Sequence, residues 1–409
     1  MNESTVRISL PLLLLLLSLP LLAETIYTPS LPDLASFFGV KNSLAEFTIS
    51  IYLIGFAFGI LFWGRVSDFI GRKPAMLYGL VIYILSCAGC IMSNEIMYLL
   101  ISRFIQAFGA STGSVISQTM LRDVLDDKKR GKIFSIIGMV MSVSPAIGPL
   151  IGSYSSSYYG WVSTFYILLF YGIVLLISSF IYLPETMKPK QKQHPAASFF
   201  STAKRLFQDK MVMGLCCIIG IVNGIMFSFY AEAPFIFINL LKLPAKHYGL
   251  IGLISIAFII GSEISRRLNH SRNPKIIIKL GCWIISFGAT ILALVGNFGM
   301  IEYSKGNLAY LAAILPMFII FIGISVTIPN CLSIALDNYK HVLGTAGSIF
   351  GFSYYVIISL VTFIMGKIHN GTSIPMVSYF LILAISMIIV YYYAINNTKE
   401  NMHVLQSRQ

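Results

Sequence analysis

Long apolar runs alternate with short polar breaks along the whole chain. A helix that crosses a membrane needs about 20 apolar residues, and twelve runs reach that length. The predicted spans are residues 8–29, 44–64, 75–93, 98–119, 132–153, 161–183, 211–233, 247–267, 275–296, 307–328, 342–365 and 373–394. We therefore predict an all-α membrane protein with twelve transmembrane helices and with both termini on the same side of the membrane.

The longest polar break divides these spans into two equal groups. Residues 184–210 contain six Lys or Arg residues and no apolar run of membrane length. We predict an N-terminal six-helix half over 1–183, a cytoplasmic linker over 184–210, and a pseudo-symmetric C-terminal half over 211–409 that ends in a short cytoplasmic tail. Within the linker, Phe and Leu alternate with Lys and Arg between residues 199 and 207, which fits either a helix on the inner membrane surface or a solvated linker.

Composition and charge agree with a membrane protein. The chain has 409 residues, of which 56% are hydrophobic and 11% charged, and its mean hydropathy is +0.80, which excludes a soluble domain of this size. With the N-terminus inside, nearly all Lys and Arg residues fall in cytoplasmic segments. The opposite face holds Lys41, Lys242, Lys246, Lys305 and Lys367. This asymmetry predicts cytoplasmic termini in a bacterial inner membrane, and it accounts for the net charge of +13 without a nucleic-acid partner.

Two further features are read as ordinary membrane-protein sequence. The Leu-rich start is followed by many more spans and by a poor cleavage site, so we interpret it as the first helix and not as a secretory signal. All six cysteines fall inside apolar runs, where a small buried side chain is the usual role. We therefore expect neither a disulfide nor a metal site.

The most informative polar break lies between the second and third spans. It reads Gly64-Arg65-Val66-Ser67-Asp68-Phe69-Ile70-Gly71-Arg72-Lys73-Pro74. The spacing G-x-x-x-D-x-x-G-R-K resembles the loop between helices two and three of the major facilitator superfamily. The resemblance implies a transporter of that fold, in which Gly64, Asp68, Gly71, Arg72 and Lys73 form a conformational latch. Asp68 is expected to bind a helix N-terminus or Arg72. The polar stretch from residue 261 to residue 274 looks like a degraded second copy of this loop.

Ionisable groups inside a membrane cost several kcal/mol unless they are paired or hydrated, so each one is a functional candidate. The candidates for proton coupling are Glu24, Arg103 and Glu232, with Glu24 as first choice. The helical rise of about 1.5 Å per residue places Glu24 and Arg103 at the same depth, where they can meet or share one cavity, or form a static ion pair. Glu263 precedes two arginines, which favours an interfacial salt bridge. All six histidines fall in loops, near span ends or in the tail, so we expect a proton relay to run on carboxylates.

Two further segments resemble signatures of the same superfamily. Arg103-x-x-Gln106 is similar to the signature whose Arg is associated with proton coupling. Gly148-Pro149-x-x-Gly152, preceded by Pro145, is similar to the signature associated with antiporters, in which prolines bend the helix and glycines allow tight packing. This chain departs from the antiporter pattern, because serines stand at positions 144 and 153 where glycines are expected.

The first 185 residues resemble the Bcr/CflA type of drug exporter more closely. The resemblance rests on Tyr27-Thr28-Pro29-Ser30-Leu31-Pro32, on Tyr52-Leu53-Ile54-Gly55-Phe56-Ala57-Phe58-Gly59, on the polar loop, on Arg103-Phe104-Ile105-Gln106 and on Arg122-Asp123. Members of this type often carry Asp where Thr25 stands here, and Glu24 comes one position earlier, a shift of about 100° around the helix. We expect Tyr27, Gln106 and Asn223 to line a substrate cavity at the midplane.

These resemblances imply proton-coupled export of a small amphipathic molecule, such as a drug or a siderophore-like metabolite. The alternative is a proton symporter that imports a nutrient or an iron chelate. An enzyme would need a nucleophile with a base, or a metal cluster, at membrane depth, and the predicted spans contain no histidine away from their ends. No phosphate-binding G-x-x-x-x-G-K-[ST] motif is present, so we expect no ATP and no cofactor. The expected partners are the substrate, protons and the lipid bilayer, with the protein as a monomer.

Overall fold

The computed structural model describes residues 9–124, 147–187, 199–303 and 307–396. All regular secondary structure in these residues is helical, which confirms the predicted all-α class. In the described ranges, eleven helices are long and apolar enough to cross a membrane. The predicted fifth span, 132–153, lies mostly outside the described residues, and its last part belongs to a helical stretch over residues 147–159. The count of twelve spans therefore stays a prediction.

The chain packs into two compact units. The first comprises residues 1–196 and 245–252, and the second comprises residues 197–244 and 253–409. Residues 245–252 follow the predicted linker in the sequence and yet pack with the first unit, which a division by hydropathy does not anticipate.

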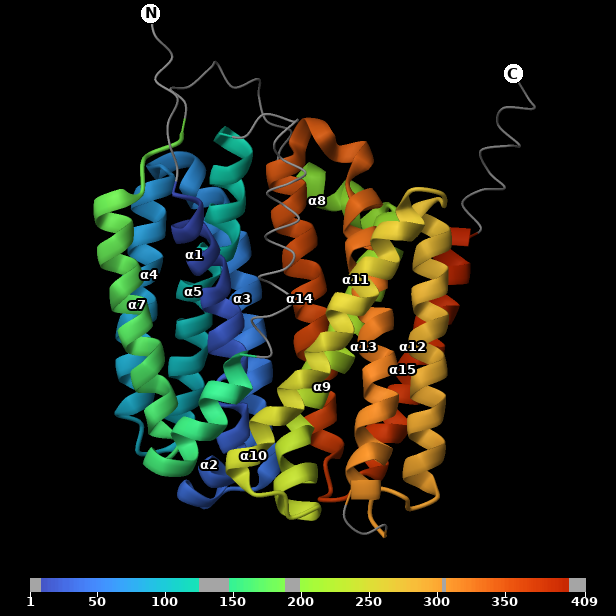
Figure 1. Ribbon diagram of the computed structural model, residues 1–409. Coiled ribbons are helices and arrows are strands. Elements are labelled where there is room, and N and C mark those ends of the chain that lie inside the picture. The colour runs from blue at the N-terminus through green and yellow to red at the C-terminus, as the bar shows by residue number, and fades with distance from the viewer. Residues whose placement is uncertain (1–8, 125–146, 188–198, 304–306, 397–409) are drawn as a thin grey trace, which may run out of the picture. The chain divides into compact units, whose positions relative to one another are not determined.

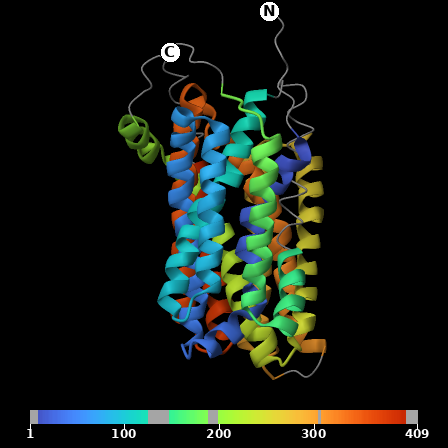
Figure 2. The same cartoon turned by 90° about the vertical axis from the view of Figure 1, so that its left-hand side faces the viewer.

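The long helices of the first unit run alongside one another in both views (Figure 1 and Figure 2). They are α1 (Leu10–Thr25), the 3-10 turn η1 (Thr28–Ser30), α2 (Leu31–Phe37), α3 (Asn42–Ile70), α4 (Arg72–Ile91), α5 (Ile96–Val124), the stretch 147–159, α7 (Val162–Tyr182) and α10 (Ala245–Tyr248). Helix α5 packs against α1, α3 and α4, and α7 packs against α1 and α4. The residues of α5 therefore meet partners from three other helices.

Small residues allow α5 to lie so close to its neighbours. A Cβ atom on Gly55 of α3 would collide with the backbone oxygen of Phe104, and one on Gly79 of α4 would collide with the side chain of Thr112. Close backbone approach of this kind is the usual basis of helix packing in membranes, where apolar burial alone gives no preference for a neighbouring helix over lipid.

The turn between α3 and α4 depends on a glycine. Gly71 ends α3 with a φ of 101°, a conformation that side-chain-bearing residues rarely adopt. A Cβ at this position would also press against the carboxylate of Glu185. The backbone conformation of Gly71 therefore lets the chain turn from α3 into α4.

The regular secondary structure in the described residues of the second unit is also all helical. It contains α8 (Phe199–Gln208), α9 (Lys210–Pro234), the π-helical turn η2 (Phe235–Leu240), α11 (Ile256–Asn269), α12 (Pro274–Asn297), α13 (Asn307–Ala335), the 3-10 segment η4 (Asp337–Val342), α14 (Leu343–Ile368), α15 (Ile374–Val390) and η5 (Tyr391–Asn396). The 3-10 segment η3 (Gly249–Ser255) joins the two units. Helix α9 packs against α13, α14 and α15.

The short helix α8 falls where the linker pattern predicts one. It packs on α9 and α14 through Thr202 and Leu206, which are buried, while Phe200 and Phe207 are exposed. This two-sided character is typical of a helix that lies on a membrane surface, which stays a prediction for this segment.

Candidate functional site

The side chain of Arg103 is completely buried in the first unit, at a position where α5 faces α1 and α3. Its guanidinium carbon lies 4.1 Å from the ring centre of Tyr27 and 4.2 Å from that of Tyr52. The ring of Phe165 on α7 lies 5.8 Å away. A cation over an aromatic face is attracted by the ring's negative face, and the attraction reaches about 2 kcal/mol or more where water is excluded. The three aromatic rings therefore surround the charge of Arg103.

Arg103 donates its hydrogen bonds to neutral oxygen atoms. Its Nη1 donates to the backbone oxygen of Ala23 at 3.1 Å and to Oε1 of Gln106 at 2.5 Å. The amide of Gln106 in turn donates to the sulfur of Cys87 at 3.0 Å. Tyr27 and Tyr52 are fixed from outside this group, since their hydroxyls bond to Thr48 and to the backbone oxygen of Pro20. The whole cluster is thereby tied to α1, α3 and α4.

Glu24 lies beside this cluster without joining it. It occupies the last turn of α1 and is 3% exposed, and neither of its carboxylate oxygens has a hydrogen-bond partner in the described part of the chain. Arg103 donates to the carbonyl oxygen of Ala23, the residue next to Glu24. This contact agrees with the prediction that Glu24 and Arg103 lie at the same depth in the membrane. A static ion pair between Glu24 and Arg103, one of the alternatives left open by the sequence, is not formed in this structure, where the guanidinium contacts aromatic rings and carbonyl oxygens.

The antiporter-like segment packs on the same end of α1. A Cβ atom on Gly148 would collide with the hydroxyl of Thr25, and one on Gly152 would collide with the backbone oxygen of Ile26. These two glycines therefore let the 147–159 helix approach the residues that directly follow Glu24. A Cβ atom on Gly249 would lie 3.1 Å from the backbone oxygen of Pro149, so this glycine also allows a close approach to the 147–159 helix. The predicted Pro145 lies outside the described residues.

The residues expected to line a substrate cavity have different surroundings. Tyr27 and Gln106 are fully buried, and both contact the side chain of Arg103. Asn223 belongs to the second unit, where its amide donates to the backbone oxygen of Ile219 one turn earlier in α9. A substrate-binding role for the three residues stays a prediction.

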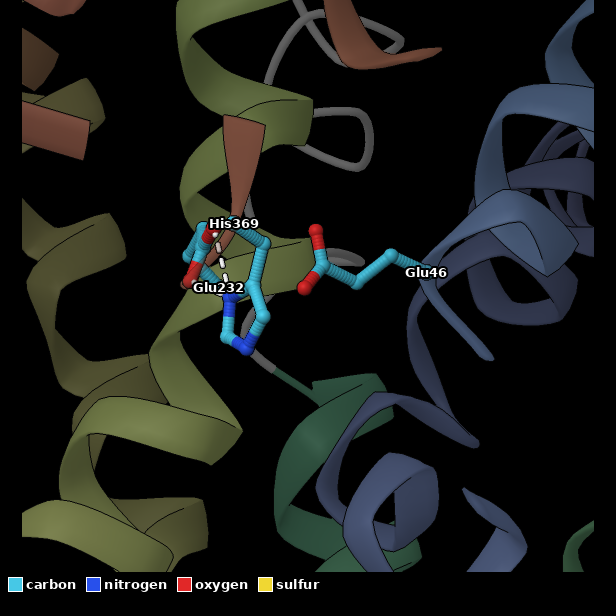
Figure 3. Close-up of side chains that lie close together, drawn as sticks. All are labelled: Glu46, Glu232 and His369. Atoms are coloured by element: carbon cyan, nitrogen blue, oxygen red, sulfur yellow. Dashed lines mark hydrogen bonds and ion pairs between the residues drawn. The ribbon is translucent and has the colours of Figure 1, made fainter. Parts of the chain in front are cut away.

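In the second unit, Glu232 has a partner that the sequence analysis missed. The Nδ1 atom of His369, directly after α14, lies 3.0 Å from Oε1 and 2.9 Å from Oε2 of Glu232 (Figure 3). The two side chains are 1% and 6% exposed for Glu232 and His369, respectively. The sequence analysis considered carboxylates alone for a proton relay and did not place a histidine beside Glu232. The available signal was a histidine four residues beyond the predicted span 342–365.

The polar loop between α3 and α4 forms a network of charges around Arg72. Its guanidinium pairs with Asp68 at 2.5 Å, one turn earlier, and its Nη1 also donates to the hydroxyl of Ser67 at 2.8 Å. The Nε atom donates to Asp123 at the end of α5, at 3.4 Å. Of the two partners predicted for Asp68, the structure shows Arg72. Ser67 also donates to the carbonyl oxygen of Gly64, at 3.4 Å.

The N-terminus of α4 is capped by Glu185, which follows α7 and which the sequence analysis placed only in the linker. Its carboxylate accepts hydrogen bonds from the backbone N–H groups of Arg72 at 3.0 Å and Lys73 at 3.1 Å. It also accepts from the N–H groups of Thr186 and Met187. Partial burial acts to raise the pKa of Glu185, but the four N–H donors outweigh it and hold the pKa below its ordinary value.

Lys73 and Glu263 complete the charged groups singled out in the sequence. The ammonium group of Lys73 donates to the backbone oxygen of Phe180 on α7 at 2.9 Å, so the loop is bonded both to α7 and, through Glu185, to the segment that follows it. In the second unit, Glu263 pairs at 2.7 Å with both Arg266 and Arg267. This exposed cluster has the salt-bridge geometry predicted for it.

Comparisons with known proteins agree with the loop and helix signatures. A family model described as Major Facilitator Superfamily matches residues 13–362. An uncharacterized transporter of Rickettsia bellii is 37% identical over 386 residues, which cover 93% of this chain and 95% of that protein. A bicyclomycin resistance protein homolog of Haemophilus influenzae is 25% identical over 92% of this chain and 93% of its own length. A chloramphenicol resistance protein of Pseudomonas aeruginosa is 26% identical over 92% and 89%.

Among solved structures, the chain is similar to the xylose transporter XylE from E. coli in a partially occluded inward open conformation. The TM-score is 0.73 with 14% sequence identity, over 94% of this chain and 95% of that chain. At this level of identity the similarity shows the fold alone. The relatives named for antibiotic resistance agree with the resemblance to the Bcr/CflA type.

Proposed function

Because the chain belongs to the Major Facilitator Superfamily and is a membrane-spanning transporter, we propose that it exports a small amphipathic molecule in exchange for protons. The membrane is the bacterial inner membrane, with both termini in the cytoplasm, as the Lys and Arg distribution favours. Drugs and siderophore-like metabolites are the proposed substrate classes. Relatives named for bicyclomycin and chloramphenicol resistance support export.

The observation that carries the proton coupling is the buried carboxyl group of Glu24. It has no hydrogen-bond partner in the described residues, and it lies beside a cation that is already bound by rings and carbonyl oxygens. An ionised carboxylate without partners costs several kcal/mol in apolar surroundings. Its protonation state must therefore change together with its surroundings, which is the requirement for coupling proton uptake to a conformational change.

The contacts around Glu24 support a mechanical link. On one side, the backbone of Ala23 is bound by Arg103 of α5, and on the other, Thr25 and Ile26 are in contact with the glycines of the 147–159 helix. A shift of the end of α1 against either helix changes what surrounds Glu24. We therefore assign Glu24 the role of proton carrier and Arg103 the role of positioning residue for the end of α1.

The energetics suffice for export. Each proton that enters along a membrane potential of about 100 mV releases about 2.3 kcal/mol. A tenfold concentration ratio corresponds to about 1.4 kcal/mol, so one charge moved supports a substrate gradient of about fifty-fold. Such a transporter needs no nucleotide.

The network at the polar loop is the proposed latch of the transport cycle. The pair of Asp68 and Arg72 closes the cytoplasmic ends of α3 and α4, and Asp123 extends the contact to α5. We assign this closed arrangement to the state that opens outward. Its release would accompany opening toward the cytoplasm.

Transport into everted membrane vesicles tests the proposal. Respiration acidifies the vesicle lumen, and an exporter then accumulates substrate inside. We expect radiolabelled chloramphenicol or bicyclomycin to accumulate in vesicles that contain the protein, and nigericin, which collapses the pH gradient, to remove the effect. Vesicles without the protein are the control. Loss of preloaded substrate from the lumen together with protons would contradict export and favour the symport alternative.

A further inference from the structure

We propose that Glu232 and His369 together form a second proton-binding site, within the second unit, and that loading of this site accompanies the transport cycle. The link to the transport cycle rests on the proposed function, whereas the proton-binding site itself does not. No other chemistry is required of the site, since its ligand is a proton. The sequence offered Glu232 alone, and the structure supplies the second member of the site.

The geometry of the pair requires a shared proton. The Nδ1 atom of His369 lies 2.9 and 3.0 Å from the two oxygens of Glu232, at hydrogen-bond distance from both (Figure 3). A carboxylate has only acceptor atoms, so the bond forms when Nδ1 carries a hydrogen, or when the carboxylic acid donates to a bare Nδ1. In either arrangement one hydrogen lies between the two groups, and the proton that the site gains or loses is the one beyond a neutral imidazole and an ionised carboxylate. The site is therefore a single acid–base unit and not two independent groups.

Within the second unit, η2, α13 and α15 bring an aromatic ring and no charged side chain to this pair. The ring of Phe235 lies 5.3 Å from the imidazole, centre to centre, and covers it on the side of η2. The described residues of η2, α13 and α15, which adjoin or pack against α9, include no Asp, Glu, Lys, Arg or His. Their tyrosines have other partners, because the hydroxyl of Tyr310 donates to the backbone oxygen of Leu241 and that of Tyr379 to the backbone oxygen of Val361.

The charged groups on nearby segments are engaged elsewhere. Lys367 precedes His369 by two residues, and its ammonium lies 5.7 Å from the ring centre of Phe363. Glu302, on the turn after α12, accepts hydrogen bonds from the backbone N–H and the hydroxyl of Ser373. The basic residues of α8 lie near Lys210, at the opposite end of α9.

Burial makes the site sensitive to access by water. With one proton the pair is neutral or an internal ion pair, and its net charge is zero. With a second proton it carries one positive charge, and with none it carries one negative charge. A net charge costs several kcal/mol in a site as buried as this one. The pair therefore gains or loses its proton when the site opens to water, and it holds one proton while it is closed.

The position of the pair couples it to helix motion. It joins the last turn of α9, where the α-helix gives way to the π-helical η2, to the residue that caps α14. In the middle of the two helices, Gly220 lies against Ile357 and Gly224 against Val361. Glu232 is eight residues beyond Gly224, a distance of about 12 Å along the helix. Loss of the pair would thus release the helix ends while the close contact in the middle stays.

The first experiment measures protonation without transport. The other five histidines, His194, His247, His270, His341 and His403, are replaced by Asn, and the ¹⁵N-histidine resonances of His369 are followed with pH in the full-length protein in nanodiscs. We expect the midpoint to move by about one pH unit or more, a tenfold change in proton affinity, when Glu232→Gln is added. Glu95→Gln, an exposed carboxylate replaced in the same way, is the control. Equal midpoints in all three proteins would overturn the shared site.

The second experiment measures transport in the everted vesicles. We expect Glu232→Gln and His369→Asn each to reduce pH-driven accumulation at least tenfold, while exchange of labelled for unlabelled substrate without a gradient continues. His247→Asn, which replaces an exposed histidine, is expected to leave both rates unchanged. The swap Glu232→His with His369→Glu restores an acid–base pair, and recovery of pH-driven accumulation in it separates loss of proton binding from misfolding.

The two arms separate the possible failures. If the unsubstituted protein shows no pH-driven transport, the proposed function fails, the link to the cycle falls with it, and the resonance titration alone decides the shared site. If the unsubstituted protein transports and both single variants match it, the role in the cycle is overturned even when the midpoints differ. If neither single variant transports and the swap fails to recover, the pair is structural.

Discussion

Two arginines of the first unit are buried to different depths and are stabilised in different ways. Arg103 lies among the spanning helices, where two tyrosine rings and a carbonyl oxygen bind it and, among the described residues, no carboxylate is bonded to it. Arg72 lies at the loop between α3 and α4, where Asp68 and Asp123 bind it. The carboxylates near each arginine differ in the same way. Glu24 has no hydrogen-bond partner in the described residues, whereas Glu185 accepts from four backbone N–H groups.

The difference shows what each region can do. A carboxylate that caps a helix and accepts four hydrogen bonds gains little from being protonated, so the loop is suited to a structural or latching role. A buried carboxyl group that accepts no hydrogen bond from the described residues, as at Glu24, is suited to exchange a proton, because no hydrogen bond there holds it in its ionised form. The same residue types thus stabilise a closed loop between α3 and α4 and, among the spanning helices, form the proposed site of proton coupling.

The largest expected effect comes from Glu24→Gln. The amide keeps the shape of the side chain and removes the proton, so pH-driven accumulation in everted vesicles should fall to the background level, a loss of at least tenfold. Substrate binding, measured by quenching of tryptophan fluorescence, should change less than twofold. Glu95→Gln, at an exposed position, should transport normally. Normal uphill transport in Glu24→Gln would remove the contrast between the two regions and leave the site in the second unit as the coupling site.

Arg103→Lys tests whether the rings of Tyr27 and Tyr52 require the planar guanidinium group or only a positive charge. A guanidinium is planar and stacks on tyrosine rings while it donates to Ala23 and Gln106, and an ammonium group cannot keep this geometry. Loss of the stacking and of one hydrogen bond should lower stability by about 1–3 kcal/mol and reduce transport about tenfold or more.

The matched substitution Arg72→Lys at the loop sharpens this test. A lysine there still pairs with two carboxylates, so we expect a smaller loss of stability than at Arg103. Thermal unfolding of both variants measures the difference. Equal losses would mean that the ring cluster contributes no more than a surface ion pair.

Glu185→Gln is expected to have a pH-dependent effect of about 0.5–1 kcal/mol, near the lower range for a helix cap because the side chain is exposed. The pKa of Glu185 lies below its ordinary value in the folded protein. The carboxylate therefore contributes stability above the pKa of the unfolded chain, and this contribution is lost as the pH falls through the lower folded pKa.

Unfolding at a series of pH values checks this sign. The unsubstituted protein should be more stable than Glu185→Gln at neutral pH, and the two stabilities should converge below about pH 4. A constant difference across the range would show that the carboxylate charge has no part in capping α4.

Asp68→Asn is expected to have the smallest effect. The side chain is 49% exposed, and exposed ion pairs contribute about 0.2–1 kcal/mol, which shifts a two-state equilibrium by a factor of about 1.4 to 5. The resting population should move by that factor toward the form open to the cytoplasm. Labelling of single cysteines on the two faces, in a background without the six native cysteines, measures it. Lost transport with unchanged labelling would make Asp68 a folding determinant.

Several parts of the candidate sites were predictable because they depend on local sequence. The helical rise placed Glu24 and Arg103 at one depth, and the bond from Arg103 to the backbone of Ala23 agrees with that level. The spacing of the loop residues placed Asp68 one turn before Arg72, where their side chains meet. Neither inference required knowledge of how the helices pack.

The partners of these residues were not predictable in the same way. The ring of Tyr52 comes from α3, and Glu185 reaches the start of α4 from beyond α7, more than one hundred residues later. His369 and Glu232 are likewise 137 residues apart. Each contact depends on which helices are neighbours and on how each is rotated about its axis, and an apolar run fixes neither.

The sequence by itself determined that this protein is an all-helical membrane transporter, because the length of the apolar runs and the spacing of the loop residues are local properties. Only the tertiary structure decided that Arg103 is bound by aromatic rings, that Glu24 is not paired with it, and that His369 completes the site of Glu232. The physical reason is that a buried charge is stabilised by whatever groups the packing of other helices brings within bonding distance.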